Sequence, residues 1–389
     1  MLTSDLGSWR AEFPTISQEE IVHLNHCMVS PLPQRALDAR RECERKWQTA
    51  HPHPWDEWYD KIDEARERFA DLINADTSEI AVVPSVTQAV SQIASAFDSD
   101  GGQEVVMTEM EFPSMWQFWD AQQRQRDVTV RMAESTDGRR ITEDGYAEAI
   151  TDDTDLVTTS HAFSATGGTM DPKTVADLVH DRGGYLFLDA YQSAGIVPID
   201  VDEQDVDMLA AGTTKFLLGG PGAAFLYADS DLIAELEPST LGWFSSDDRF
   251  EVEDPDYAED ATRFQLGTPP ITNMYQVSAG LSVVQEVGVD TITQAISELT
   301  DHLITGAEER GFTTATPKDS DLRAGIVNIK VDDYEAACEK LVDDGFRLSY
   351  IESRVVDSGI RFSPHFYTTH EEIEAALDSL EEHATPYSG

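Results

Sequence analysis

Residues 206–227 read VDMLAAGTTKFLLGGPGAAFLY, and this stretch decides the fold we expect. Its apolar run 208–211 is typical of a buried strand, which delivers Thr213, Thr214 and Lys215 to a turn ahead of a glycine-rich loop. The other six lysines have polar neighbours, whereas Lys215 lies between an apolar strand and Phe-Leu-Leu. Burial lowers a lysine pKa, and a neutral amine is what a Schiff-base lysine needs. This stretch alone leaves open a strand-end lysine that extends to solvent.

Short apolar strands alternate with helical patterns through the first 270 residues. The expected strands cover residues 80–83, 105–108, 156–160, 185–188 and 208–211. This alternation is typical of an α/β domain with a mainly parallel sheet. In such sheets ligands gather at the carboxyl ends of the strands. We expect Thr87, Phe112, His161, Asp189 and Lys215 at those ends, so the sequence predicts one site there.

The 389 residues exceed one ordinary core, which indicates two domains. We expect a lead-in over residues 1–20 that packs on the small domain, a large domain over 21–270 and a smaller C-terminal α+β domain over 271–389. Helical patterns at 272–287, 291–309, 333–344 and 369–382 and strands at 325–331, 346–351 and 358–363 support the last assignment. Residues 51–55 are expected to form a rigid aromatic loop.

The composition is strongly acidic, with 27 basic and 74 acidic residues and a formal net charge of −47. Such a surface repels nucleic acid and anionic membranes, so we expect neither as a partner. The acid is scattered along the chain, which indicates a solvated surface suited to high salt. A halophilic source is therefore a hypothesis.

The three cysteines, Cys27, Cys43 and Cys338, have no metal-ligand spacing, and no metal is expected. They indicate a reducing cytoplasm, with most or all of them as small buried hydrophobes. The first residues lack the pattern of a signal peptide, and no apolar run approaches membrane-spanning length. We therefore expect a cytoplasmic protein.

Asp189-Ala190-Tyr191-Gln192 followed 26 residues later by Lys215 resembles the class V aminotransferase family of fold-type I pyridoxal 5′-phosphate enzymes. That family includes cysteine desulfurases, selenocysteine lyases and kynureninases, and the resemblance covers roughly residues 20–385. It implies that Asp189 pairs with the pyridine nitrogen, that Gln192 contacts the phenolic oxygen and that Lys215 forms the Schiff base. Without the resemblance, Asp189 reads as a turn residue and Gln192 as a helix cap.

Further motifs extend the resemblance to the phosphate and the ring face. Val86-Thr87-Gln88 resembles the family's phosphate-binding turn, which suits a helix start; a plain N-cap is the alternative. The resemblance also gives Thr214 a phosphate contact, and it gives Thr268, in the segment RFQLGTP over 263–269, a contact with the phosphate of a second subunit. It therefore implies a homodimer with shared sites. Phe112 would stack on the cofactor unless it is a core residue, and His161 would lie near it.

The segment GIRFSPHFY over 359–367 resembles the family's carboxylate-binding segment. There the resemblance gives Arg361 the substrate α-carboxylate, which suits a planar guanidinium. Two positions depart from the family pattern: Thr368 stands where asparagine is usual, and so does Ser164.

The motifs predict a pyridoxal-phosphate enzyme acting on an α-amino acid through Lys215, by transamination or β-elimination. A kynureninase-like hydrolase is the alternative, supported by motifs such as Phe112-Pro113-Ser114. A cysteine desulfurase or selenocysteine lyase is disfavoured because no cysteine lies between Gly345 and Arg361. A catalytically inactive regulator of the same fold is the non-enzyme alternative. A nucleotide-binding protein is weaker still, because the glycine-rich loop lacks a Walker or dinucleotide motif.

Overall fold

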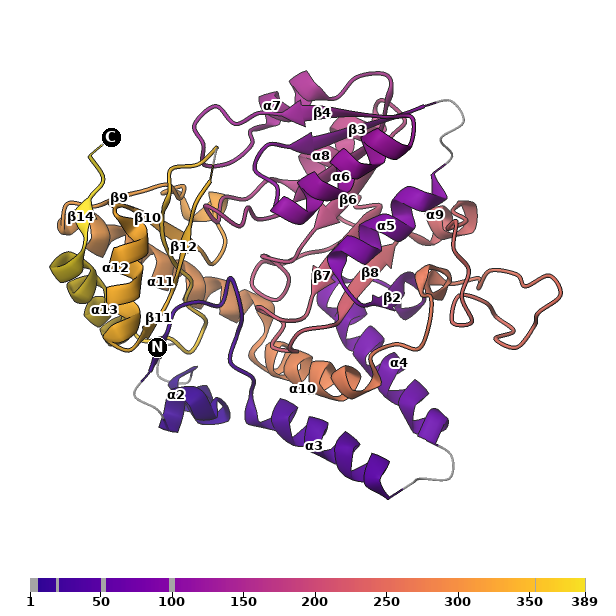
Figure 1. Cartoon of the computed structure of the whole chain (residues 1–389), viewed down its shortest axis with the longest axis horizontal. Helices are drawn as coiled ribbons and strands as arrows, with labels where there is room; N and C mark the ends of the chain where they lie inside the picture. The colour runs from indigo at the N-terminus through magenta and orange to yellow at the C-terminus, as the bar shows by residue number, and fades with distance from the viewer. Residues whose placement is uncertain (1–5, 19–20, 50–53, 98–101, 354, 389) are drawn as a thin grey trace.

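The computed structural model describes residues 6–18, 21–49, 54–97, 102–353 and 355–388. Its centre is a seven-stranded sheet in the order β2-β8-β7-β6-β5-β3-β4 (Figure 1). The strands are β2 (Ile80–Val83), β3 (Gln103–Thr108), β4 (Val128–Ala133), β5 (Thr154–Ser160), β6 (Tyr185–Asp189), β7 (Met208–Gly212) and β8 (Ala224–Ala228). Only β8 runs antiparallel to its neighbours, so the mainly parallel sheet is confirmed.

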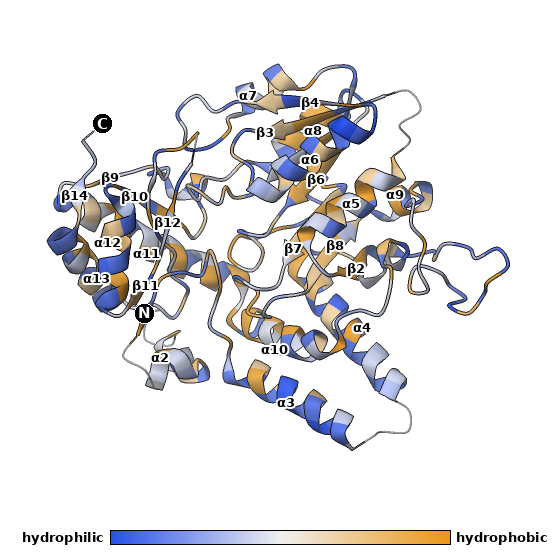
Figure 2. Cartoon of the chain, viewed as in Figure 1, coloured by the Kyte–Doolittle hydropathy of each residue, from blue (hydrophilic) through white to orange (hydrophobic). Residues whose placement is uncertain are grey.

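Helices lie on both faces of this sheet (Figure 1). They are α3 (Gln34–Gln48), α4 (Pro54–Ile73), α5 (Val86–Ala96), α6 (Pro113–Gln125), α7 (Glu143–Ala149), α8 (Pro172–His180), α9 (Ser230–Glu235) and α10 (Ile271–Val287), with 3-10 turns η2 (Thr77–Glu79) and η3 (Ala261–Phe264). Figure 2 shows hydrophobic residues on the central strands and many hydrophilic ones along α3.

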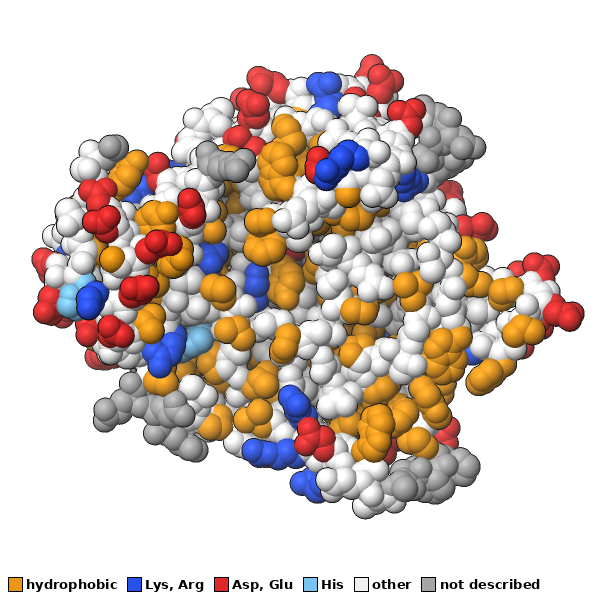
Figure 3. Space-filling view, in the orientation of Figure 1, with side chains coloured by type: hydrophobic (Ala, Val, Ile, Leu, Met, Phe, Trp, Pro, Cys, Tyr) orange, Lys and Arg blue, Asp and Glu red, His pale blue; other side chains and the backbone are white. Residues whose placement is uncertain are grey.

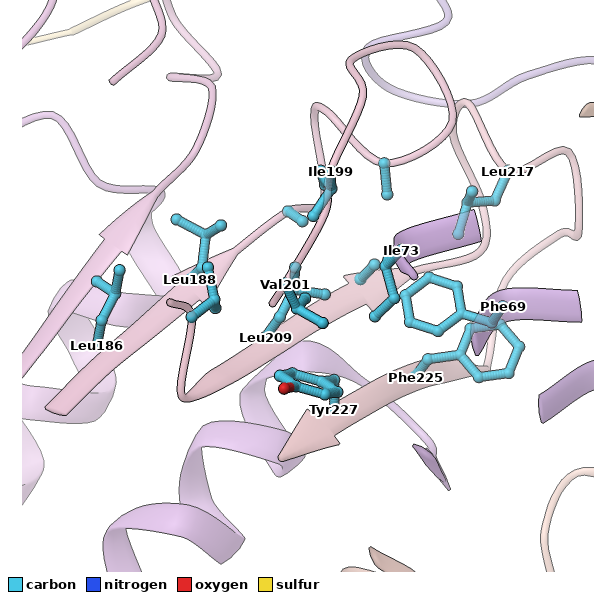
Figure 4. Packing of buried hydrophobic residues seen from close by; sticks show 14 of the residues in the cluster. Phe69, Ile73, Leu186, Leu188, Ile199, Val201, Leu209, Leu217, Phe225 and Tyr227 are labelled. Carbon is cyan, nitrogen blue, oxygen red and sulfur yellow. The ribbon is translucent and has the colours of Figure 1, made fainter. Parts of the chain in front are cut away.

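Two hydrophobic cores flank the sheet because successive side chains of a strand point to opposite faces. Leu209 and Ala211 belong to one core, and Met208 and Ala210 belong to the other. Figure 4 shows the first core, where Phe225 stacks on a phenylalanine of α4. Strands buried on both faces therefore explain the continuous apolar runs of the sequence.

The C-terminal part of the chain forms the second, smaller layered unit. It contains α11 (Val289–Glu309), β9 (Thr313–Thr314), η4 (Ser320–Leu322), β10 (Val327–Asp332), α12 (Tyr334–Asp343), β11 (Phe346–Arg347), β12 (Ser349–Ile351), β13 (Gly359–Phe362), α13 (His370–His383) and β14 (Thr385–Pro386). Its sheet has the order β12-β13-β10-β14, with β9 also paired to β10. The α+β character expected of this part is confirmed.

The N-terminal segments join this smaller unit. In the lead-in, η1 (Gly7–Glu12) is followed by α2 (Pro14–Gln18). Arg10 donates to the backbone oxygen of Tyr367 and forms an ion pair with Glu372. The strand β1 (Val22–His23) pairs in parallel with β11.

Three local features differ from expectation. α10 packs against α3 and α4 rather than inside the smaller unit, so a boundary at residue 270 remains a proposal. Pro54 and Trp55 open α4 instead of ending a loop, because proline is well tolerated in the first turn of a helix; residues 51–53 lie outside the described residues. The strand β4 was not expected, because Thr129 and Arg131 interrupt its apolar residues and leave no continuous apolar run.

Among the helices of the described residues, none is long and apolar enough to cross a membrane.

Candidate active site

The carboxyl ends of the parallel strands surround one cavity of about 310 Å³. β5 ends at Ser160, β6 ends at Asp189, and β7 leads through Thr213 to Lys215. The residues that line the cavity are Ser85, Val86, Thr87, Phe112, Ser114, Ser160, Ala162, Ser164, Asp189, Tyr191, Gln192 and Lys215. Segments more than a hundred residues apart in sequence thus meet at one sheet edge, as the strand pattern predicts.

Lys215 carries its amine between two aromatic rings. Nζ lies 4.3 Å from the ring centroid of Tyr191 and 5.8 Å from that of Phe112. The Lys215 pKa is lowered to about 8, mainly by burial and also by the Arg361 charge, while Asp189 opposes the shift. With this pKa, roughly a tenth of the amine is neutral at pH 7 and about half at pH 8. Nucleophilic and basic lysines react in this neutral form.

Tyr191 reaches Lys215 by crossing the end of β7. The Tyr191 hydroxyl donates to Thr214 Oγ1 at 3.3 Å. A Cβ atom at Gly212 would lie 2.1 Å from the Tyr191 ring, so glycine is required for this close approach.

Asp189 is a buried carboxyl, and its neighbours offset only part of the free-energy cost of burying its charge. Its Oδ1 accepts the backbone N–H of Tyr191 at 2.9 Å, and only 7% of the residue is exposed. Burial raises the Asp189 pKa, whereas the Lys215 charge lowers it. A cation bound against Asp189 would offset the cost of burying this carboxylate.

Gln192 lies beside Asp189 with half of its amide unused. Nε2 donates to the backbone oxygen of Cys27 at 3.0 Å. Oε1 is buried and has no hydrogen-bond partner in the described part of the chain. Gln192 also lines the cavity, so a ligand hydroxyl there would satisfy this acceptor.

The opposite wall of the cavity is the start of α5. Ser85 caps this helix by accepting the Gln88 N–H at 3.2 Å. Val86 and Thr87 follow in the first turn, where backbone N–H groups lack intrahelical partners and the helix dipole favours an anion. The predicted phosphate position thus faces the cavity that contains Lys215.

Arg361 on β13 approaches the cavity from the smaller unit. Its Nη1 donates to the backbone oxygen of Ser164 at 2.9 Å, and its Nη2 donates to Ser349 Oγ at 3.0 Å. The residue is only 6% exposed, and Nε has no partner among the described residues. A buried guanidinium without a carboxylate partner among the described residues suits an incoming carboxylate.

Besides Arg361, three predicted residues lie outside the lining of this cavity. Thr214 accepts a hydrogen bond from Tyr191, which lines the cavity. Thr268 is exposed on the segment after η3. His161 donates its backbone N–H to the Asp189 backbone oxygen at 2.9 Å, but its side chain lines a larger cavity of about 680 Å³. Burial lowers the His161 pKa to about 4, so the ring is neutral.

Sequence reasoning missed several residues that surround the site. Tyr191 stands inside the motif that identifies Asp189, and only the tertiary structure places its ring on Lys215. Cys27 is buried, as are Cys43 and Cys338, which confirms that expectation. Its Sγ nevertheless lies 4.0 Å from Ser349 Oγ, the atom that Arg361 also contacts. Glu111, which was also missed, follows β3 and has no signal in the sequence beyond its place before Phe112.

The fold and these groups fit pyridoxal 5′-phosphate. Asp189 supplies a carboxylate for the ring nitrogen, Gln192 supplies a free acceptor, and the start of α5 supplies an anion site. A fold-type I pyridoxal-phosphate enzyme is thus the class that the architecture and the cavity define.

The family model for class V aminotransferases matches residues 29–376, so the chain belongs to that family. An uncharacterized aminotransferase, YcbU, of Bacillus subtilis is 37% identical over 326 residues, covering 84% of this chain and 85% of that protein. A probable cysteine desulfurase of Halobacterium salinarum is 27% identical, covering 97% and 96%. A kynureninase of Bacillus mycoides is 28% identical, covering 95% and 89%.

Among solved structures, a C-DES mutant with glycine covalently linked to the PLP cofactor superposes with a TM-score of 0.89. It is 24% identical and covers 96% of this chain and 99% of its own, so it supports the fold. The family and these relatives make the protein a pyridoxal-phosphate-dependent enzyme, and the regulator alternative is set aside.

Proposed function

We propose that the protein acts on an α-amino acid by transamination or β-elimination. The observation that carries this proposal is the pairing of two groups at one cavity. Lys215 lines the cavity and offers an amine with a lowered pKa. Arg361 donates to the backbone oxygen of Ser164, which lines the same cavity. An amino-acid substrate needs both, because its α-carboxylate binds a guanidinium while its α-carbon faces a base.

Pyridoxal phosphate, when bound, supplies an electron sink for negative charge at the substrate α-carbon. Asp189 would hold the ring nitrogen in its protonated form, and Thr87 with the start of α5 would bind the phosphate. Phe112 would lie against one ring face. Lys215 would hold the aldehyde carbon.

Lys215 then serves as the base at the α-carbon. Because burial lowers its pKa to about 8, its neutral form is available to accept the α-proton and to return it elsewhere. Arg361 fixes the α-carboxylate and so orients the α-carbon toward Nζ. Two features decide between transamination and elimination: the substrate side chain that the enzyme recognises, and the atom to which the proton is returned.

The relatives support two readings of that choice. The aminotransferase YcbU is 37% identical and favours transamination. Kynureninases at 28% identity keep a kynureninase-like hydrolase as the second candidate. A persulfide relay remains disfavoured, because the segment 345–361 contains no cysteine.

The test is a visible absorption spectrum of the purified protein in concentrated salt, recorded with L-amino acids added one at a time. A band that bleaches with one amino acid and returns with a keto acid supports transamination. A band that persists while ammonia accumulates supports elimination, and release of anthranilate from kynurenine supports the hydrolase. Lys215→Ala serves as the control that should lose turnover. A fully active Lys215→Ala protein contradicts the proposed base.

We also propose a homodimer with shared sites. Trp47, Phe250 and Val252 are 65%, 82% and 86% exposed. The last two lie on a loop that projects from the body between α9 and η3 (Figure 1), and hydrophobic side chains also gather near α4 (Figure 3). Thr268 lies exposed beyond η3, where it would reach a partner's phosphate. Sedimentation should give twice the 43.1 kDa chain mass; a monomer with full activity contradicts the proposal.

A cytoplasmic location without nucleic-acid or membrane partners completes the proposal. The free cysteines support a reducing compartment, and the net charge of −47 opposes binding to polyanions. Fractionation of the source cells tests the location.

A further inference from the structure

Glu111 lies in the turn between β3 and α6, and its carboxylate is held by three donors. Oε1 accepts the Thr108 hydroxyl at 2.7 Å and the Ser160 backbone N–H at 2.9 Å. Oε2 accepts the Ser160 hydroxyl at 2.6 Å. Only 6% of Glu111 is exposed, so a titratable carboxyl is fixed deep in the protein. Three donors aimed at both oxygens favour the ionised form.

The partner of Glu111 stands next to the candidate cofactor site. Ser160 ends β5, lines the cavity of Lys215, and pairs in register with Asp189 on the neighbouring strand. Ser160 therefore links the two carboxyls: it donates to Glu111 and lies beside Asp189 in the sheet. The two buried carboxyls interact, because the Asp189 charge raises the Glu111 pKa.

We propose that Glu111 is a positioning residue, which fixes the Ser160 hydroxyl and places a second negative charge behind Asp189. This inference rests on the proposed function and goes beyond it. Two carboxylates would then favour the positive ring nitrogen that Asp189 alone would hold. A purely structural link between β3 and β5 would not need a charge, because neutral groups also bridge strands.

The surroundings define how pH acts on this arrangement. Burial raises the Glu111 pKa to about 7, while its hydrogen bonds lower it. The titratable or charged groups that face it are Asp189 on β6, Tyr146 on α7, and Lys215 beyond Asp189. The Tyr146 hydroxyl contacts Thr159 Oγ1 at 2.8 Å, and burial raises its pKa, so it stays neutral. As pH falls through about 7, Glu111 gains a proton and its support of the ring cation is lost.

The experiment compares pyridoxal-phosphate binding to the cofactor-free protein with and without Glu111→Gln. A Lys215→Ala background removes covalent attachment, so that affinity reports the remaining contacts. Glu111→Gln should weaken binding about tenfold at pH 8 and should weaken it less at pH 6, where the wild-type carboxyl is protonated. A second measurement keeps Lys215 and follows the visible absorbance of the cofactor-loaded protein as pH changes. The midpoint of this titration should be lower in Glu111→Gln than in the wild type, because a negative charge has been removed.

Two further variants separate charge from structure. Glu104 lies at the other end of β3, and its Oε1 also accepts two threonine hydroxyls, at 2.6 and 2.9 Å. Glu104→Gln is the matched control and should change neither affinity nor midpoint. Ser160→Ala removes the hydroxyl bond but keeps the backbone N–H bond, so it should give part of the effect. Glu111→Asp keeps the charge and should retain the pH dependence of binding, even if Glu111→Gln fails to fold.

Equal affinity and equal pH dependence in wild type and Glu111→Gln would overturn the inference. So would a loss of pH dependence in Glu111→Asp, because that result assigns the effect to shape. A wild-type protein that binds no pyridoxal phosphate would overturn both the inference and the proposed function. Binding to the wild type with no effect of Glu111→Gln leaves the proposed function intact and rejects the inference alone.

Discussion

Arg361 tests the substrate assignment at the scale of one residue. Its two Nη atoms hold Ser164 and Ser349, a planar arrangement that a lysine ammonium cannot reproduce. Arg361→Lys should raise KM for the amino acid about tenfold to a hundredfold, with cofactor affinity unchanged. Steady-state kinetics and a cofactor titration measure the two quantities. Arg347→Lys, on β11 of the same unit, is the control, and an unchanged KM in Arg361→Lys contradicts the role.

Lys215 gives a prediction of pH dependence. Its pKa is lowered from 10.5 to about 8, so the neutral amine appears as pH rises through about 8. The rate of covalent attachment of added pyridoxal phosphate should therefore rise up to about pH 8 and then level off. Stopped-flow absorbance measures it, and Lys215→Ala should show no attachment. A rate that keeps rising tenfold per pH unit to about pH 10 would indicate an ordinary lysine.

At the scale of an element, the start of α5 should bind the cofactor phosphate. Thr87→Val keeps the shape and removes the hydroxyl that faces the cavity. Cofactor affinity should fall roughly tenfold, since one hydrogen bond to a charged group is lost. Equilibrium dialysis checks this. Thr142→Val at the start of α7 removes a cap at a residue that does not line the cavity and should leave affinity unchanged. Equal losses in both variants would point to general destabilisation.

The central sheet depends on packing between α4 and β8. Phe225 and Phe69 are fully buried and stack with centroids 4.4 Å apart (Figure 4). Phe225→Ala should lower the free energy of unfolding by about 3–5 kcal/mol, because it leaves a cavity. Urea unfolding measures this loss. Val252→Ala, at a side chain that is 86% exposed, should change it by less than about 0.5 kcal/mol.

At the scale of the whole molecule, the net charge of −47 governs the response to salt. Acidic side chains are spread over the visible face, especially on the smaller unit (Figure 3). Screening should relieve their repulsion, so the thermal midpoint should rise by several degrees between about 0.1 M and about 1 M KCl. Calorimetry at both concentrations tests the halophilic hypothesis. A midpoint that falls or stays constant contradicts it.

Local sequence patterns determined much of the large sheet and several of the residues around the cavity. Apolar runs such as 208–211 predict buried strands because they are covered on both faces, and parallel strands place their carboxyl ends together. Asp189 and Lys215 could therefore be assigned to one site, and the resemblance to class V aminotransferases added Gln192. The strand β4 was not predicted because Thr129 and Arg131 interrupt its apolar residues, so it has no such run.

The tertiary structure alone decided the contacts that cross between distant segments. The Tyr191 ring on Lys215, the Ser349 oxygen shared by Arg361 and the carboxylate of Glu111 behind Ser160 depend on how strands pair and how loops close. The side chain of His161 lines another cavity for the same reason. The sequence by itself determined which strands and which chemical groups this protein has, because burial and turn preferences are local. Distances between those groups, and hence their pKa values, arise only from long-range packing.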